Sequence, residues 1–206
     1  RGLADGCTIV HALNERLAPL AWMVAGRRPF VLNAYGTFAT RPLTRWARRP
    51  IASHVYSRAA AIACISHYTA RRLTELLPQA RTVVVRSGVD IDHFSGPPDA
   101  GLQAAPVILS IGAIKPRKGY HVMLEALPRI IAAVPNVEWH IVGRSDYPAY
   151  ARRLEDRVRE LGVEHAVGFL GAVDERVLGR GLQQCAIFAL TPVNAGDAYE
   201  GYPLVF

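Results

Sequence analysis

The chain has 206 residues, of which 50% are hydrophobic and 20% are charged, a balance typical of globular proteins with enough apolar surface for a core. No apolar run reaches the roughly 18 residues that a membrane-spanning helix needs. The net charge of +7 lies entirely within residues 1–100, and no base-stacking aromatic pattern accompanies it. We therefore expect no membrane span and no nucleic-acid partner.

Short apolar runs, several of them β-branched, alternate with helical segments through the first half of the chain. Asn14 is placed to cap one helix and Gly26 to end it, and Ser66 is placed to cap another. We expect strands at residues 8–11, 30–32, 61–65 and 82–85, and helices at residues 14–26, 43–57 and 68–77. This succession is typical of a parallel sheet with both faces covered by helices.

Four arginines surround a tryptophan in one predicted helical segment. Arg41, Arg45, Arg48 and Arg49 flank Trp46. Two interpretations stay open: a solvated basic face, and a basic face that rests peripherally on an anionic membrane.

A stretch rich in Pro and Gly at residues 95–101 predicts a linker. It divides the chain into a first domain at residues 1–95, a linker at 96–106 and a second domain at 107–206. In the second domain we expect strands at residues 107–111, 139–142, 167–170 and 186–190, and helices at 119–134, 150–161 and about 175–184. The predicted fold class is α/β, with two Rossmann-like, doubly wound parallel-sheet domains facing a cleft.

Ligands of such sheets bind at the carboxyl ends of the strands, so the loops after Ile111, Val142, Leu170 and Leu190 are expected to line one rim. No metal site is expected there, because His67, His121 and His140 have no partner at ligand spacing. The cysteines are Cys7, Cys64 and Cys185, which are odd in number and far apart. They predict buried thiols in a reducing compartment.

The loop at residues 112–119 places Lys115, Arg117 and Lys118 between a strand and the start of a helix. Unpaired N–H groups at a helix N-terminus favour anions, and lysines add point charge for a diphosphate. Taken alone, the loop fits a solvated basic turn equally well.

The Glu200-Gly201 pair follows a loop that leaves a predicted buried strand, and an apolar run comes after it. The Glu200 carboxylate can accept hydrogen bonds from sugar hydroxyls, and the following N–H groups can meet a phosphate if they open a helix. A lone Glu-Gly pair would favour a solvated loop acid.

The order and spacing of several segments resemble family 4 glycosyltransferases, which are retaining nucleotide-sugar transferases with the B-type fold of two Rossmann-like domains. On the donor side the matching segments are residues 108–112, 118–119, 124–126, 140–143, 161–162, 167–171 and 200–205. On the acceptor side they are residues 9–12, 35–37, 65–66, 88–90 and 94.

The resemblance implies that Lys118 binds the donor diphosphate and that Glu200 is the first carboxylate of the family's Glu-x7-Glu motif, which contacts the transferred sugar. Both are the expected catalytic residues. Further donor-binding positions are Gly112, Lys115, Arg117, Gly143, Gly201 and Leu204, and acceptor-side positions are His11 and Tyr35. The second carboxylate is expected two residues beyond Phe206, and the family's opening strand with its Gly-rich loop is absent. We therefore expect both domains to be incomplete, in a fragment truncated at both ends.

Two positions depart from the family pattern. The usual Gly-Arg is Gly112-Ala113 here, which removes a phosphate cation that Lys115 or Arg117 is placed to replace. The usual His-Gly of the acceptor side is Tyr35-Gly36.

The implied function is a hexosyl transfer from a nucleoside-diphosphate sugar to a hydroxyl acceptor, such as a lipid-linked or polysaccharide precursor. No cofactor is expected, because the nucleotide sugar is the substrate, and the expected location is the cytoplasm or the cytoplasmic face of the membrane. The fragment itself is expected to be poorly active. A non-catalytic module that binds nucleotide sugars or glycans is the alternative. A dinucleotide-dependent dehydrogenase is rejected, because neither Gly112 nor Gly143 opens a Gly-x-Gly-x-x-Gly run.

Overall fold

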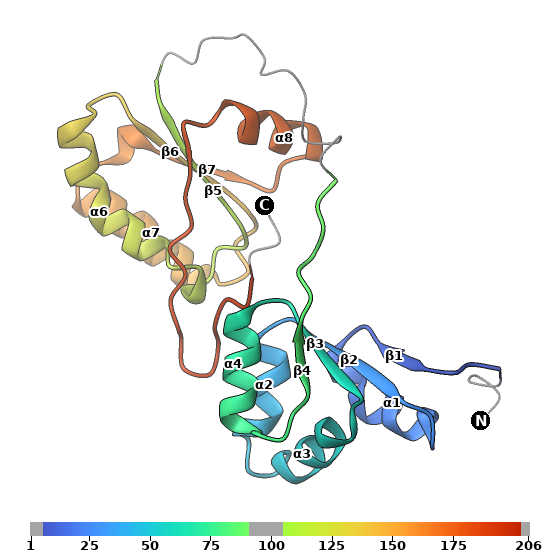
Figure 1. The fold of residues 1–206 in the computed structure, drawn as a ribbon. Helices are drawn as coiled ribbons and strands as arrows, with labels where there is room; N and C mark the ends of the chain where they lie inside the picture. Colours follow the sequence, from blue (N-terminus) through green and yellow to red (C-terminus); the bar gives the residue numbers. More distant parts are fainter. Residues whose placement is uncertain (1–5, 91–104, 203–206) are drawn as a thin grey trace. The chain divides into compact units, whose positions relative to one another are not determined.

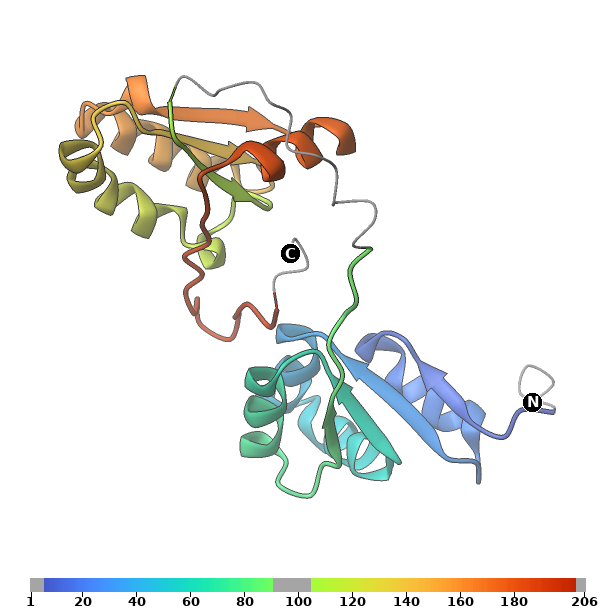
Figure 2. The ribbon, with the colours of Figure 1, turned by 45° about the horizontal axis from the view of Figure 1, so that its top comes forward.

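A computed structural model describes residues 6–90 and 105–202 (Figures 1 and 2). Its contacts divide the chain into two compact units. Unit 1 comprises residues up to Gly88 together with a later segment that begins at Gly196, and unit 2 comprises Val89–Ala195. The predicted linker at 96–106 lies mostly outside the described residues. The sequence predicted that residues 107–206 form the second domain. In the structure, residues 196–202 instead pack with unit 1.

Unit 1 contains a four-stranded parallel sheet, as the alternating pattern predicts. Its strands β1 (Val10–Ala12), β2 (Phe30–Ala34), β3 (Ala61–Cys64) and β4 (Thr82–Val84) lie side by side in sequence order. The connecting helices are the 3-10 helix η2 (Glu15–Leu17), α1 (Ala18–Ala25), α2 (Thr37–Thr44), α3 (Arg49–Arg58) and α4 (His67–Leu76). The core between sheet and helices includes Leu32, Leu43, Ile62 and Leu73.

The predicted helix caps of unit 1 are confirmed. The Asn14 side chain accepts a hydrogen bond from the Arg16 N–H at 2.9 Å, and Ser66 Oγ accepts one from the Thr69 N–H at 3.1 Å. Gly26 ends α1 with φ of 60°. These contacts satisfy N–H groups that the first turns of the helices leave without a partner.

The prediction of one helix over residues 43–57 is wrong, because two helices and a turn occupy this region. Helix α2 ends at Thr44, Arg45 is extended, and α3 begins at Arg49. Pro50 is consistent with a new helix at Arg49, since proline is favoured in the first turn of a helix, where its missing N–H is not needed. The arginines that flank Trp46 therefore come from α2, from the turn and from the start of α3.

Unit 2 contains a second parallel sheet in the order β7 (Val167–Gly171), β6 (Glu138–Val142), β5 (Val107–Ile111) and β8 (Ile187–Phe188). The chain order reverses between β5 and β8, which is the switch point of a doubly wound sheet. The helical elements are η3 (Pro116–Lys118), α6 (Tyr120–Ala133), α7 (Pro148–Glu160), η4 (Glu164–Ala166) and α8 (Glu175–Gln184). Helices α6 and α7 cover one face of the sheet and α8 covers the other, so the central strand β5 is buried along its whole length (Figures 1 and 2).

One polar relay crosses the core of unit 2. The Trp139 indole N–H donates to Ser110 Oγ at 2.9 Å, and that hydroxyl donates to the Ala189 carbonyl at 2.7 Å. Trp139 is only 1% exposed, so its N–H needs this partner. The relay ties β6 to β5 and to the segment just after β8.

The three cysteines are free thiols, and Cys64 alone is buried. The prediction of buried thiols is therefore wrong for the exposed Cys7 and only partly met by the half-buried Cys185. Within residues 6–90 and 105–202, no cluster of His, Cys, Asp and Glu is arranged to hold a metal ion. The helices in this part of the chain are too short or too polar to cross a membrane.

Candidate functional site

The loops that follow the strands of unit 2 meet at the carboxyl edge of its sheet, as predicted. The Gly112 N–H donates to the Val142 carbonyl and the Gly143 N–H to the Gly171 carbonyl, both at 2.8 Å. The Ile114 N–H donates to the Arg144 carbonyl, also at 2.8 Å. The loops after β5, β6 and β7 are thus joined side by side by backbone hydrogen bonds.

The approach of two of these loops is so close that it excludes a side chain. A Cβ atom added at Gly143 would lie 2.0 Å from the Gly112 carbonyl oxygen. The Tyr120 hydroxyl donates to that same oxygen at 2.6 Å. Gly112 and Gly143, both predicted donor-binding positions, therefore form one rigid backbone surface at the edge of the sheet.

The Lys118 side chain lies over this backbone surface. A Cβ atom built on Gly112 would be 3.2 Å from Lys118 Cε and 3.4 Å from Lys118 Nζ. Lys118 is half-buried at the carboxyl end of the central strand β5, next to the start of α6. This is the place where a doubly wound sheet receives an anionic ligand.

The loop after β8 holds the turn that carries Lys118. Thr191 Oγ1 donates to the Gly119 carbonyl at 2.8 Å, and the Val193 N–H donates to the Arg117 carbonyl at 3.0 Å. Gly119 has φ of 72°, and a Cβ atom there would lie 1.6 Å from the Thr191 carbonyl oxygen. Lys115 precedes the η3 turn and Arg117 lies within it, both half-buried. Sequence reasoning missed Thr191, because nothing local marks a contact across 72 positions.

Glu200 lies on a segment that is bound to unit 1. Thr37 Oγ1 donates to the Tyr199 carbonyl and accepts from the Tyr199 N–H, each at 2.9 Å. Ser66 Oγ donates to the Gly201 carbonyl at 2.6 Å. Residues 199 and 201 on either side of Glu200 are thereby fixed by hydroxyl groups at the starts of α2 and α4.

The Tyr199 side chain anchors this segment in the interior of unit 1. It is 5% exposed and packs edge-on against Tyr68, with ring centroids 5.3 Å apart. Burial raises the pKa of the Tyr199 phenol, because the apolar surroundings disfavour the charged phenolate. A tyrosine directly before Glu200 was a visible signal in the sequence, but its role as an anchor was not predicted.

The acceptor-side residues lie together beside this anchored segment. A Cβ atom at Gly201 would be 2.4 Å from the Tyr35 carbonyl oxygen, so only glycine fits there. The Tyr35 hydroxyl accepts a hydrogen bond from Asn33 Nδ2 at 2.8 Å, and Asn33 Oδ1 lies 2.9 Å from His11 Nε2. Asn33, which sequence reasoning missed, thus links the two predicted residues. Its signal was a polar side chain directly after the apolar run at residues 30–32, at the carboxyl end of a predicted strand.

The two predicted catalytic residues belong to different units. Lys118 is grouped with Gly112 and Gly143 in unit 2, while Glu200 and Gly201 are grouped with Tyr35 in unit 1. Leu204, the remaining predicted donor contact, lies outside the described residues.

Replacing Thr37 with valine is expected to loosen the segment around Glu200. The change removes the partner of the Tyr199 N–H and carbonyl, and an unpaired part-buried polar group costs about 1–3 kcal/mol. Amide exchange at Tyr199, followed by mass spectrometry or NMR, should therefore accelerate by about tenfold or more. Thr74→Val is the control, because the Thr74 hydroxyl donates to the Ala70 and Arg71 carbonyls within its own helix α4 and not to the segment of Tyr199. Unchanged protection of Tyr199 in Thr37→Val would contradict the anchoring role.

Comparison with known families identifies both halves of the chain. The family model described as "Glycosyl transferases group 1" matches residues 100–206, and the one described as "Glycosyltransferase Family 4" matches residues 3–93.

Curated relatives match over nearly the whole chain. A GDP-mannose-dependent alpha-(1-6)-phosphatidylinositol monomannoside mannosyltransferase of Mycolicibacterium smegmatis is 29% identical over 204 residues, covering 92% of this chain and 51% of that protein. A phosphatidyl-myo-inositol mannosyltransferase of Mycobacterium tuberculosis is 27% identical over 203 residues, covering 96% of this chain and 51% of that protein. The chain thus spans about half the length of the curated relatives it matches.

Solved structures share the fold. Anabaena HepE in complex with UDP-glucose superimposes with a TM-score of 0.75 and 20% identity, over 93% of this chain and 55% of the other. The sucrose-phosphate synthase of Thermosynechococcus elongatus gives a TM-score of 0.77 and 19% identity, over 99% of this chain and 54% of the other. The prediction of two Rossmann-like domains is confirmed by these neighbours.

Proposed function

The chain belongs to family 4 of the glycosyltransferases, and on that premise we propose that it transfers a hexose from a nucleoside-diphosphate sugar to a hydroxyl of a lipid-linked acceptor, with retention of configuration. The observation that carries this proposal is the position of Lys118, whose ammonium group is held over Gly112 at the carboxyl end of β5. GDP-mannose is the donor and a phosphatidylinositol mannoside the acceptor that we propose first, because relatives named for these substrates match nearly the whole chain.

In the proposed reaction the bond between the anomeric carbon and the diphosphate oxygen breaks, and a bond to the acceptor oxygen forms on the same face. Negative charge develops on the departing diphosphate, and Lys118 stabilises it, with Lys115 or Arg117 in place of the arginine missing at Ala113. The departing phosphate takes the acceptor proton, so no strong protein base is required. Glu200 orients the sugar through its hydroxyls.

The location that fits this function is the cytoplasmic face of a membrane. Arg41, Arg45, Arg48 and Arg49 are exposed on unit 1 and would contact anionic lipid peripherally, which would bring the enzyme to an acceptor embedded in the bilayer.

The test is sugar transfer by the full-length protein. GDP-mannose and UDP-glucose are offered separately with phosphatidylinositol lipids, and the product is followed by mass spectrometry and the new anomeric bond by NMR. A product whose configuration matches the donor is expected. Binding of a nucleotide sugar without any turnover would instead support the non-catalytic binding module.

Replacing Glu200 with glutamine should lower transfer by about tenfold to a hundredfold. The change keeps the size of the side chain but removes its charge, and a hydrogen bond to a charged group contributes about 1.5–3 kcal/mol. Binding of the nucleoside diphosphate alone, measured by calorimetry, should stay unchanged, because Glu200 is assigned to the sugar. Weaker binding of the free diphosphate in Glu200→Gln would move Glu200 to a different role.

A further inference from the structure

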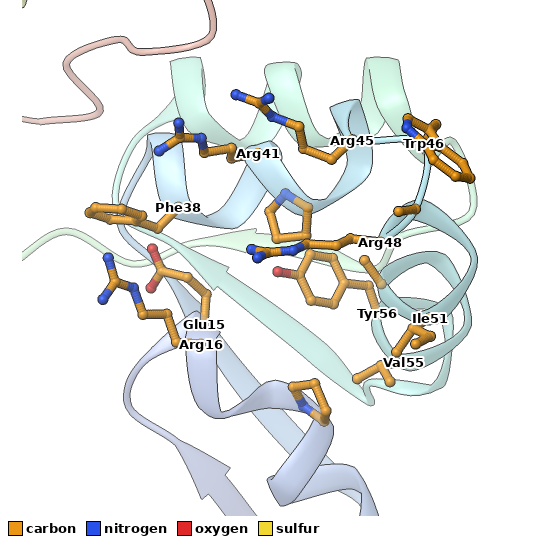
Figure 3. Close-up of a pocket in the computed structure, with 14 residues that line it drawn as sticks. Glu15, Arg16, Phe38, Arg41, Arg45, Trp46, Arg48, Ile51, Val55 and Tyr56 are labelled. Carbon is orange, nitrogen blue, oxygen red and sulfur yellow. The ribbon is translucent and has the colours of Figure 1, made fainter.

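A small pocket of about 110 Å³ lies at the carboxyl edge of the unit 1 sheet. Its lining includes Asn33, Tyr35, Ala63, Ile65, Arg86 and Ser87. A larger pocket of about 930 Å³ opens between η2, α1, α2 and α3 (Figure 3), and no described residue lines both. Arginines already assigned to the membrane line the larger pocket, so the small pocket is a separate candidate site.

The ends of three neighbouring strands build the small pocket. Backbone pairing continues one residue past β3 and β4. The Ile65 N–H donates to the last carbonyl of β2 at 3.1 Å, and the Val85 N–H donates to the last carbonyl of β3 at 2.9 Å. Tyr35, directly after β2, and Arg86, close after β4, therefore lie on either side of the end of β3. Ligands of parallel sheets bind at this edge.

Two hydrogen bonds fix the direction in which the Tyr35 hydroxyl donates. An amide oxygen only accepts and an amide nitrogen only donates. His11 Nε2 therefore donates to Asn33 Oδ1 at 2.9 Å, and Asn33 Nδ2 donates to the Tyr35 hydroxyl oxygen at 2.8 Å. Because the tyrosine oxygen accepts this bond, its own proton stays available. Tyr35 is thus presented to a ligand as a hydrogen-bond donor.

Arg86 adds a positive charge and further donors to the pocket. A guanidinium group carries five N–H donors and no acceptor. Within residues 6–90 and 105–202, no carboxylate lines the pocket and none forms an ion pair with Arg86. The complementary ligand group accepts hydrogen bonds and is negatively charged. The small volume suits one oxyanion, such as a phosphate group, and not a whole sugar ring.

We propose that this pocket binds a phosphate group of the acceptor substrate, with Arg86 and the Tyr35 hydroxyl as donors and Asn33 as the residue that positions Tyr35. The proposal rests on the sugar transfer proposed above and specifies how the acceptor is recognised. The pocket adjoins the segment that carries Glu200, since a Cβ atom at Gly201 would lie 2.4 Å from the Tyr35 carbonyl oxygen. An acceptor held by its phosphate would therefore have its hydroxyl groups near the sugar that Glu200 orients.

The test measures binding of acceptor fragments to the full-length protein by calorimetry, with and without GDP. The probes are myo-inositol, myo-inositol 1-phosphate and glycerophosphoinositol, which share one ring. The better phosphorylated probe should bind roughly tenfold more tightly than inositol, the effect of one hydrogen bond to a charged group. Preference for the monoester indicates a soluble sugar phosphate as the source, and preference for the diester indicates a lipid headgroup. Equal binding of all three probes, or binding of none, would overturn the proposal.

Two arginines at opposite ends of β4 form a matched pair of variants. Arg81 precedes β4 and Arg86 follows it, and both are exposed, but only Arg86 lines the pocket. Arg86→Ala should weaken binding of the phosphorylated probe about tenfold and leave inositol binding unchanged, whereas Arg81→Ala should change neither. Equal losses in the two variants would show that only overall charge matters. Weaker GDP binding in Arg86→Ala would assign Arg86 to the donor diphosphate and also overturn the proposal.

Asn33→Asp tests the positioning role. Aspartate has the same shape, but its carboxylate only accepts hydrogen bonds, so the Tyr35 hydroxyl would donate to it and no longer to the ligand. Binding of the phosphorylated probe should fall by about tenfold or more, partly through the added negative charge. In a Tyr35→Phe background the charge effect persists and the effect on the hydroxyl is absent, so the loss should be smaller. The same loss in both backgrounds would show that Asn33 does not position Tyr35.

These binding measurements separate the phosphate site from sugar transfer. If the probes and variants behave as expected but no sugar is transferred, the phosphate site stands and the proposed transfer fails. If sugar is transferred while inositol and its phosphates bind equally, the proposed transfer stands and the phosphate site fails.

Discussion

Replacing Lys118 with alanine in the full-length protein is expected to lower turnover by about two to three orders of magnitude, the loss seen when one preorganised electrostatic group is removed from a transition state. The Lys118 ammonium lies beside Gly112 on a backbone surface that is rigid because Gly112 and Gly143 are in close contact. A group held in this way stabilises developing charge without first having to reorganise. The measurement is the initial rate of sugar transfer at saturating donor, together with the donor Michaelis constant.

Two further variants make this result interpretable. Lys118→Arg keeps the positive charge but not the compact ammonium, and it should recover part of the lost rate. Arg153→Ala removes a positive charge from α7 of the same unit and should leave turnover unchanged. If Lys118→Ala transfers sugar at the normal rate, Lys118 has no part in the chemistry, although the family membership would remain.

Replacing Gly119 with alanine is expected to disrupt the donor loop and to destabilise unit 2 by several kcal/mol. Two causes add up: the left-handed backbone costs an L-residue about 1–2 kcal/mol, and the new methyl group would lie 1.6 Å from the Thr191 carbonyl oxygen. The Thr191 backbone would have to move, which would break the hydrogen bond from the Thr191 hydroxyl to the Gly119 carbonyl.

Gly162→Ala separates these two causes. Gly162 has φ of 65°, close to the 72° of Gly119, but no atom lies within 4 Å of an added Cβ. This control should lose only about 1–2 kcal/mol and keep donor binding. Urea denaturation and calorimetric titration with the nucleoside diphosphate measure both properties. Similar losses in the two variants would mean that backbone strain dominates and that the contact with Thr191 is unimportant.

The sheet of unit 2 was predictable because its strands are buried on both faces. Such strands appear as short apolar runs, and the runs at 107–111 and 139–142 coincide with β5 and β6 to within one residue.

The helix at 43–57 was predicted wrongly because the two prolines in this region have different positions, one inside a helix and one in the first turn of the next helix. Pro42 lies inside α2, which the pattern did not indicate, and Pro50 lies in the first turn of α3.

The Lys118-Gly119 turn was predictable from local sequence, since a basic loop between a strand and a helix is a local pattern. The hydrogen bond from Thr191 that holds this turn was not predictable, because 72 positions of the chain separate Thr191 from Gly119. The attachment of Tyr199 to unit 1 is of the same kind, with 162 positions between Tyr199 and Thr37. Contacts of this separation depend on how strands are ordered in space, which periodicity in one chain does not encode.

The return of residues 196–202 to unit 1 has a consequence for biosynthesis. During translation the whole of Val89–Ala195 is synthesised before the segment that carries Tyr199. Until then Thr37 and Ser66 lack the partners that they have in the finished structure. Unit 1 therefore depends on residues that are translated after strands β5 to β8, and the Glu200 segment can take its place only after those strands have been synthesised.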